Sequence, residues 1–166
     1  QKQKFKNLYE QCRSVHIPVV REQTAQLLCQ LIETKQPKNI LEIGTAIGYS
    51  GTLMLLAGKT SKLTTVELSA EMCQKAHQTF ADNNVADRVQ IKNQNALEFF
   101  EQNDQKFDFI FLDGPKGQYV KYLPHIKNAL NQGGVCFCDD VLYFGMVKDD
   151  SLVIHKKITI VRNLRE

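Results

Sequence analysis

The sequence has no long apolar run, no internal repeat and no low-complexity tract. No stretch approaches the roughly 20 apolar residues that a membrane-spanning helix needs. No basic segment followed by an apolar one, of the signal-peptide type, opens the sequence. From these absences we expect a cytoplasmic protein that does not enter a membrane.

The five cysteines include no Cys-x-x-Cys pair, which argues against a zinc site or a thioredoxin-like redox site. Cys136 and Cys138 alternate within an apolar run, so both side chains would lie on one face of a strand. We expect the thiols to be reduced and to behave as small, buried apolar groups.

What the sequence contains fits one globular domain. Its 166 residues suffice for a single hydrophobic core, and an apolar content of 43% with a charged content of 23% is ordinary for a globular protein. The formal net charge of +3 is mild. The basic residues gather near the two ends: Lys2, Lys4, Lys6, His155, Lys156, Lys157, Arg162 and Arg165. Such ends could contact a polyanion or could belong to solvated helix faces.

Strand-like and helix-like segments alternate through the middle of the sequence. The predicted strands cover residues 39–44, 62–67, 88–92, 107–113 and 134–139, and the predicted helices between them cover 47–58, 70–82, 95–103 and 118–131. This alternation predicts an α/β fold with a doubly wound, mostly parallel sheet and helices on both faces.

The single domain, residues 1–166, divides into three parts. Residues 1–38 would hold two helices, 5–15 and 21–34, separated by a break at Pro18. Residues 39–140 form the alternating core, and residues 141–166 a loop with a last helix.

Residues 39–50 read N-I-L-E-I-G-T-A-I-G-Y-S and place Glu42 inside an apolar run typical of a strand buried on both faces. Burial of this carboxylate is costly unless a neighbouring polar group or a ligand satisfies it. The turn that follows has Gly44 and Gly48 but lacks the middle glycine of G-x-G-x-x-G. That absence argues against a dinucleotide and favours a nucleoside without a pyrophosphate.

Acidic residues stand at the ends of three predicted strands. Glu67 ends the second, Asp113 the fourth, and Asp139 with Asp140 the fifth. Because open parallel sheets bind ligands beyond the carboxyl ends of their strands, four acids at this edge point to a cation or a polyol. Glu67, about 20 residues after the glycine turn, is where a carboxylate would hold two ribose hydroxyls.

Four segments together resemble the S-adenosylmethionine-dependent O-methyltransferases of the catechol and caffeoyl-CoA type: L-E-I-G-T-A-I-G-Y-S, V-E-L, L-D-G-P-K-G-Q-Y and D-D-V-L. The resemblance covers residues 8–166 and is closest to short bacterial members. Among these, the tRNA 5-hydroxyuridine methyltransferases act on the anticodon wobble base. The resemblance implies a Rossmann-like methyltransferase fold and an enzyme that uses S-adenosylmethionine.

The resemblance also assigns the cofactor contacts. Glu42 would face the amino group of the methionine end, Gly44 would let the backbone approach closely, and Ser50 would bind the carboxylate. Glu67 would hold the ribose, and Tyr119 would lie near the sulfur or bind the backbone of its own loop. The full set of implied cofactor contacts is Glu42, Gly44, Ala46, Tyr49, Ser50, Glu67, Leu68, Asn95, Ala96, Asp113 and Tyr119.

For the reaction, the resemblance implies a divalent cation held by Asp113, Asp139 and Asp140. Three hard oxygen ligands suit Mg²⁺. The ion would bind two neighbouring substrate oxygens and lower the pKa of the hydroxyl group to which one of them belongs. Lys116, with Asp113, is implied in catalysis, where it assists deprotonation or stabilises the oxyanion. The alternative is a solvated loop lysine.

Three features depart from the family pattern. Asp140 stands where the family commonly has Asn, and Gln94-Asn95 replaces a usual Gly-Asp at the adenine turn. The family sheet normally closes with two further strands, whereas this sequence stops at Glu166.

The expected acceptor is 5-hydroxyuridine at the tRNA wobble position, with a small catechol-like phenol as the alternative. A protein that binds S-adenosylmethionine without catalysis also stays open. A nicotinamide-dependent oxidoreductase would share the fold but would need the missing glycine pattern. From the resemblance we expect a homodimer, with the N-terminal helix as a reasonable interface.

Overall fold

Five parallel strands form one sheet in the computed structural model, which describes Glu10 and residues 19–166. The strand order is β3-β2-β1-β4-β5. The strands are β1 (Asn39–Ile43), β2 (Lys62–Glu67), β3 (Val89–Asn93), β4 (Phe107–Leu112) and β5 (Leu130–Cys138). The helix expected over residues 5–15 lies, apart from Glu10, outside the described residues.

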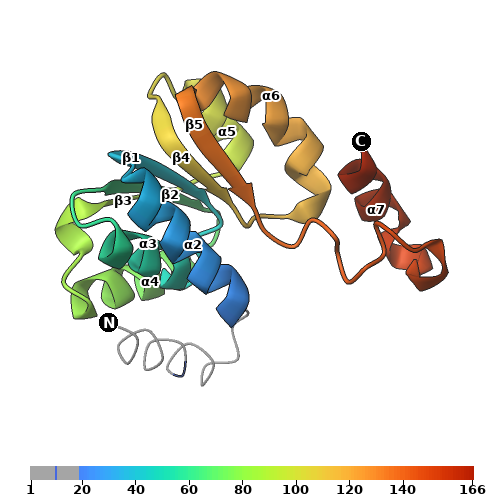
Figure 1. Cartoon of the computed structure of the whole chain (residues 1–166), viewed down its shortest axis with the longest axis horizontal. Helices are drawn as coiled ribbons and strands as arrows, with labels where there is room; N and C mark the ends of the chain where they lie inside the picture. Colours follow the sequence, from blue (N-terminus) through green and yellow to red (C-terminus); the bar gives the residue numbers. More distant parts are fainter. Residues whose placement is uncertain (1–9, 11–18) are drawn as a thin grey trace.

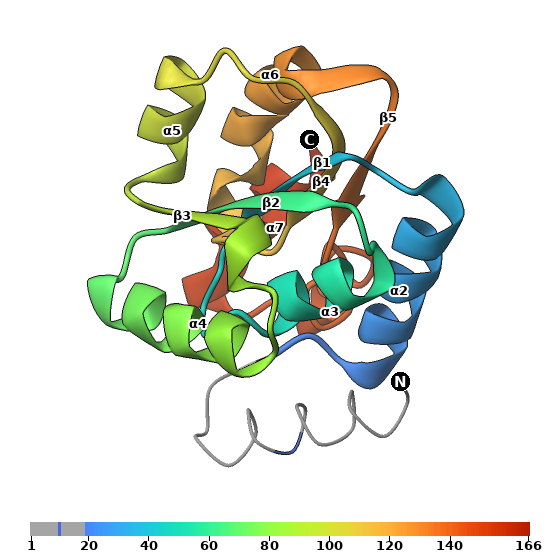
Figure 2. The same cartoon turned by 90° about the vertical axis from the view of Figure 1, so that its left-hand side faces the viewer.

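Helices cover both faces of this sheet, as Figures 1 and 2 show. One face carries α2 (Glu22–Lys35), α3 (Tyr49–Ala57) and α4 (Ala70–Asp82), and the other carries α5 (Ala96–Gln102) and α6 (Tyr119–Ala129). The last helix, α7 (Ile158–Arg165), packs beside α6 and the short 3-10 turn Lys116–Gln118. The predicted doubly wound architecture is therefore confirmed.

The two faces of β1 explain its continuous apolar sequence. Ile40 belongs to the hydrophobic cluster under α2, α3 and α4, whereas Leu41 and Ile43 belong to the cluster under α5 and α6. Glu42 shares the side of Ile40, because alternate residues of a strand face the same way. The acid is thus enclosed by the core.

The largest difference from the predicted bounds is at the start of the last strand. Residues 130 and 131 were expected in a helix and the last strand was expected to start at residue 134, yet α6 ends at Ala129 and β5 begins at Leu130. Leu130 pairs with Phe107 and packs on the cluster beneath α6. Gly133, at φ 77°, allows the register shift that follows within the strand, so the glycine pair lies inside β5 and does not precede it.

The segment after Asp140 has the predicted loop and last helix. Turns and two short 3-10 segments, Asp150–Leu152 and His155–Lys157, lead into α7. Arg165 ties this segment together, because its guanidinium donates to the carbonyl oxygens of Met146 and Val147 and to Asp150. Within the described part of the chain, no helix has the length and apolar character needed to cross a membrane.

Candidate active site

The strand order reverses direction between β1 and β4, which is where open α/β sheets bind their ligands. The ladder continues one residue beyond the strands: the Asp113 amide donates to the Ile43 carbonyl and the Asp139 amide to the Leu112 carbonyl, each at 3.0 Å. The carboxyl ends of β1, β4 and β5 are thereby held side by side. The predicted acids Asp113 and Asp139 stand directly after two of them.

Gly44 fixes the close approach of the β1 and β4 ends. Its φ is 100°, and a Cβ added there would lie 2.5 Å from the carbonyl oxygen of Asp113. Both the left-handed backbone and the contact exclude a side chain. The glycine turn is therefore needed by the fold of the site itself, whatever ligand it binds.

Two hydroxyl groups satisfy Glu42, whose side chain is 0% exposed. Its carboxylate accepts hydrogen bonds from the hydroxyl of Ser50 and, at 2.6 Å, from that of Thr65, which in turn lies 2.6 Å from the hydroxyl of Thr45. Burial raises the pKa of Glu42 to about 7, although the two hydroxyl donors oppose the rise. Of the two explanations open from the sequence, neighbouring polar groups suffice for burial, and the cofactor contacts of Glu42 and Ser50 stay predictions.

Glu67 lies at the end of β2 and organises the predicted ribose side. Its carboxylate accepts from the backbone amides of Ala46 at 3.0 Å and Ser69 at 2.9 Å. The side chain of Leu68 beside it is 71% exposed, as a side chain that is to cover a ligand must be. Tyr49, the first residue of α3, is buried.

The predicted adenine segment meets this edge from β3. The Gln94 amide donates to the Glu67 carbonyl at 3.1 Å, so the residues that follow lie close to Leu68. Asn95 caps α5, because its side chain accepts from the Leu97 amide at 2.8 Å, and Ala96 begins the helix. The structure thus brings Ala46, Glu67, Leu68 and Asn95 to one side of the crevice.

Lys116 and Asp113 form an ion pair of 2.7 Å on the other side. Burial raises the pKa of Asp113, the Lys116 ammonium lowers it, and the nearby Asp139 and Asp140 raise it further. Asp140 adopts a left-handed backbone with φ 54°. Lys116 is thus held inside the site, unlike the solvated lysine considered from the sequence.

The residue types at this edge suit a hard divalent cation, but they are not gathered into a metal cluster. Among Glu10 and residues 19–166, no three His, Cys, Asp or Glu side chains lie close enough together to hold a metal ion. Asp113 is paired with Lys116, and Asp139 accepts a 3.4 Å hydrogen bond from the Thr24 hydroxyl of α2. The three-carboxylate metal site therefore stays a prediction.

Tyr119 joins the ends of β4 and β5. Its buried hydroxyl donates a hydrogen bond to the Leu112 carbonyl, 3.0 Å away, or to the Asp139 carbonyl, 3.3 Å away. The Lys116 ammonium lies 5.4 Å from the centre of its ring, and burial raises the pKa of the phenol. The backbone that Tyr119 contacts is thus at the ends of β4 and β5, and the expected position near the cofactor sulfur stays a prediction.

Sequence reasoning missed three threonines of the site: Thr24, Thr45 and Thr65. The register places Thr65 directly opposite Glu42 on the neighbouring strand. A buried strand with two adjacent threonines, K-L-T-T-V-E, was the available signal, since an apolar strand needs hydroxyls only where a polar group faces it. Thr24 gave no signal, because its contact with Asp139 spans 115 residues.

The chain is similar to known methyltransferases over most of its length. The O-methyltransferase family model matches residues 2–166. A catechol O-methyltransferase from Niastella koreensis is 32% identical over 131 residues, which cover 76% of this chain and 58% of that protein. Tricin synthase 2 from Oryza sativa is 30% identical over 77% of this chain and 47% of its own length.

Solved structures give the same result. A Staphylococcus aureus protein with the provisional name caffeoyl-CoA O-methyltransferase has a TM-score of 0.87 and 36% identity, covering 97% of this chain and 78% of that one. The O-methyltransferase TomG from Streptomyces achromogenes, in complex with S-adenosylmethionine, has a TM-score of 0.83 and 26% identity over 97% of this chain and 74% of its own.

A Bacillus cereus O-methyltransferase in complex with S-adenosylhomocysteine has a TM-score of 0.85 and 25% identity, covering 99% of this chain and 76% of that one. The chain spans between 47% and 68% of the length of the first five curated relatives it matches. The family model nevertheless covers nearly all of it, and we conclude that the chain belongs to the O-methyltransferase family.

Proposed function

We propose that this chain carries out S-adenosylmethionine-dependent O-methyl transfer to a hydroxyl that lies next to a second oxygen. The observation that carries the proposal is the switch in strand order at the carboxyl ends of β1 and β4, with Glu67 and Leu68 at the end of β2 and the Lys116–Asp113 pair after β4. TomG and the Bacillus cereus enzyme, whose structures hold the cofactor or its product, support the choice of cofactor.

The residues around the glycine turn fit the cofactor. The carboxylate of Glu67, which accepts from the Ala46 amide, would bind the ribose of the cofactor. The exposed Leu68 would cover its adenine. Gly44 keeps the backbone bare at the strand end, where the methionine part would lie above Glu42 and Ser50. When bound, S-adenosylmethionine supplies an electrophilic methyl group on a sulfonium.

Lys116 is the residue best placed to act on the acceptor. Its ion pair with Asp113 fixes the ammonium at the end of β4, and contact with the Tyr119 ring limits its motion further. A fixed cation at this position stabilises negative charge that develops on the acceptor oxygen. We propose oxyanion stabilisation as its role, with proton uptake as the alternative.

We further propose that Asp113, Asp139 and Asp140 hold a divalent cation such as Mg²⁺. All three are hard oxygen donors, and they follow the ends of the neighbouring strands β4 and β5. The bound ion would acidify a hydroxyl that it chelates together with a neighbouring oxygen. Lys116 and the cation would share Asp113.

For the acceptor we propose 5-hydroxyuridine at the tRNA wobble position, since its 5-hydroxyl and 4-keto oxygens are neighbours. His155, Lys156 and Arg162 near the end of the chain are exposed and could contact phosphates. Arg165 and Lys157 contribute less, because Arg165 binds carbonyls of its own segment and Lys157 lies 5.6 Å from the centre of the Tyr143 ring.

A small catechol-like phenol is the second candidate. The names of the Niastella and rice relatives favour aromatic acceptors. Val141, Leu142 and Phe144, which is 67% exposed, follow Asp140 directly and give the acid edge apolar neighbours. An aromatic ring could pack on such side chains while its oxygens face the acids.

Radiolabelled S-adenosylmethionine with Mg²⁺ tests the proposal. One tube would hold tRNA that lacks the 5-methoxy group and another a simple catechol, each with and without a chelator. Chelator-sensitive label in the tRNA supports the wobble-base proposal, and label in the catechol alone supports the second candidate. Cofactor binding by calorimetry without label in either acceptor would contradict catalysis.

Lys116→Met should abolish most of the label. Lys75→Met is the matched control, because Lys75 also forms a 2.7 Å ion pair, with Glu71, but lies on the exposed face of α4. Equal activity of both variants would contradict the role of Lys116. The homodimer expected from the family also stays a proposal, which light scattering would test.

A further inference from the structure

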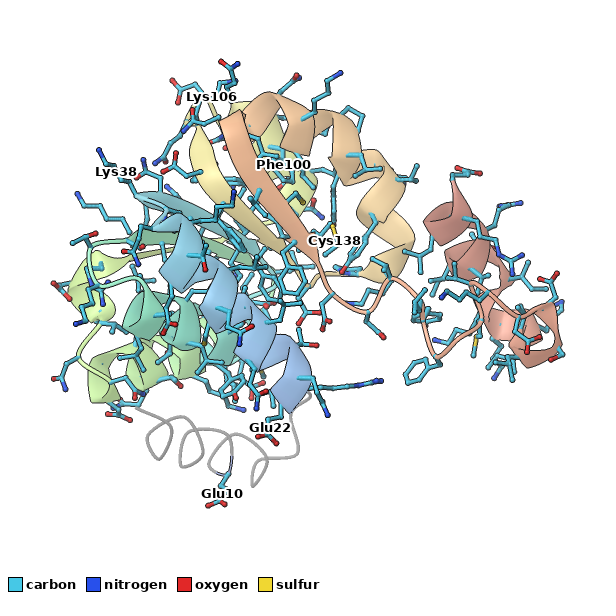
Figure 3. All side chains as sticks on the ribbon, viewed as in Figure 1. Glu10, Glu22, Lys38, Phe100, Lys106 and Cys138 are labelled. Atoms are coloured by element: carbon cyan, nitrogen blue, oxygen red, sulfur yellow. The ribbon has the colours of Figure 1, made fainter. Side chains whose placement is uncertain are left out.

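Two thiols near the active-site end of β5 have no part in the proposed function. The sulfurs of Cys136 and Cys138 lie 3.7 Å apart, and both residues are half-buried and free. The sequence predicted their shared face correctly, but it predicted buried thiols, whereas both are only partly buried. Figure 3 shows Cys138 at the end of β5 on the side of α6.

The position of these thiols connects them to the candidate acids. Cys138 immediately precedes Asp139, whose amide and carbonyl are held by Leu112 and Tyr119. Cys136 and Cys138 pair with Ile110 and Leu112 of β4. A change in the last residues of β5 would therefore reach Asp139 directly.

The sulfurs of Cys136 and Cys138 are close enough to form a bond if the strand bends locally. Residues two apart in a strand have Cα atoms about 6.6 Å apart, near the upper end of the range of about 4.4–6.8 Å found for disulfides, and their Cβ atoms would have to approach to about 3.5–4.5 Å, so the end of β5 must bend for the bond to form. The sulfurs would have to approach from 3.7 Å to about 2.05 Å. In the described part of the chain, β5 pairs with β4.

We propose that Cys136 and Cys138 form a reversible intramolecular disulfide when the protein meets a peroxide. One thiol is oxidised by hydrogen peroxide to a sulfenic acid, with release of water. The second thiol attacks that sulfur, the S–O bond breaks, the S–S bond forms, and a second water leaves. Two thiols and one peroxide thus give one disulfide and two waters, and a dithiol reductant reverses the change.

The disulfide would draw the end of β5 together and displace Asp139 relative to Asp113. A displacement of about 1 Å in a catalytic constellation can slow a reaction about 10²-fold. This effect on methyl transfer rests on the proposed function, whereas formation of the bond does not.

Differential alkylation tests the bond. The whole protein is treated with hydrogen peroxide and alkylated, and the peptide that contains both cysteines is analysed by mass spectrometry with and without dithiothreitol. We expect joint loss of both alkylation sites and their joint return on reduction. Alkylation that persists at both, oxidation to sulfinic acid, or pairing with another cysteine would overturn the proposal.

Two variants complete the test. In Cys136→Ser, no disulfide can form within this peptide, whereas in Cys29→Ala, which lacks a buried thiol of α2, the disulfide should still form and be reversed by reduction. Methyl transfer by the wild-type protein should fall about 10²-fold on oxidation and recover on reduction. An oxidised protein with full activity would overturn the effect on Asp139. Absence of methyl transfer in the reduced protein would instead contradict the proposed function. The alkylation experiment would still show whether the disulfide forms.

Discussion

Glu42→Gln should make the protein more stable at neutral pH while it weakens cofactor binding. The wild-type carboxyl group is fully buried, and its pKa rises from 4.5 to about 7 on folding. The folded state therefore holds this proton more tightly than the unfolded chain does. The contribution of Glu42 to the free energy of unfolding is greatest below pH 4.5 and is lost as the pH rises to about 7.

The size of the effect follows from the shift. At 1.36 kcal/mol per pKa unit, the rise corresponds to about 3 kcal/mol between the two ends of that pH window. Glutamine carries no charge at any pH and escapes this loss. It also has one oxygen acceptor where Glu42 has two for Ser50 and Thr65, but that difference does not change with pH.

Urea unfolding of both proteins at several pH values from 4.5 to 8 measures the effect. The stability of Glu42→Gln minus that of wild type should increase by about 3 kcal/mol across the window. Glu71→Gln, at an exposed position in α4, is the control for which we expect a much smaller trend. A flat difference for Glu42→Gln would refute the raised pKa.

Calorimetry with S-adenosylmethionine gives the second half of the prediction. If Glu42 acts on the amino group of the cofactor, the variant should bind it at least about tenfold more weakly, in line with a charged hydrogen bond of about 1.5–3 kcal/mol. Unchanged affinity would leave Glu42 as a structural acid only.

Three further substitutions, one of them with a matched control, test the fold by thermal or urea unfolding. Gly44→Ala should destabilise by about 3 kcal/mol or more, because its Cβ would meet the Asp113 carbonyl, whereas Gly133→Ala, also at positive φ but in open space, should cost only about 1 kcal/mol. Equal losses would contradict the clash. Tyr119→Phe should cost about 1 kcal/mol, because the hydroxyl that binds the Leu112 carbonyl is removed. No loss would mean that this hydrogen bond is not formed. Arg88→Met should cost about 2–3 kcal/mol, because its guanidinium donates to the carbonyls of Leu55, Gly58 and Ser61. A loss below about 0.5 kcal/mol would show that water replaces those contacts.

Local patterns sufficed to predict the fold. The apolar runs of β1 and β4, which are buried on both faces, are unambiguous over their short length. The predicted start of α4 at residue 70 is confirmed, and the preceding Ser69 caps the helix by accepting a hydrogen bond from the Met72 amide. The start of β5 was missed because Gly133 and Gly134 favour a turn before a strand. Only the pairing of Leu130 with Phe107 reveals that the strand begins earlier.

Part of the candidate site also follows from local sequence patterns. Asp113, Asp139 and Lys116 stand at strand ends, where the parallel fold itself places them together. The hydroxyl partners of Glu42 depend on the register between β1 and β2, which the sequence does not specify. The contact between Thr24 and Asp139 depends on how α2 packs, and that is decided by the whole core.

The three hydrogen bonds of Arg165 join α7 to residues 146–150. Leu164 of the same helix packs on the hydrophobic cluster beneath α5 and α6, and the side-chain amide of Asn163 donates to the Gly117 carbonyl. The segment should consequently open as one cooperative unit, and its backbone amides should exchange with deuterium together and earlier than those of the sheet. Because this unit follows Asp140 by only a few residues, its opening would expose the acid edge of the sheet without unfolding the domain.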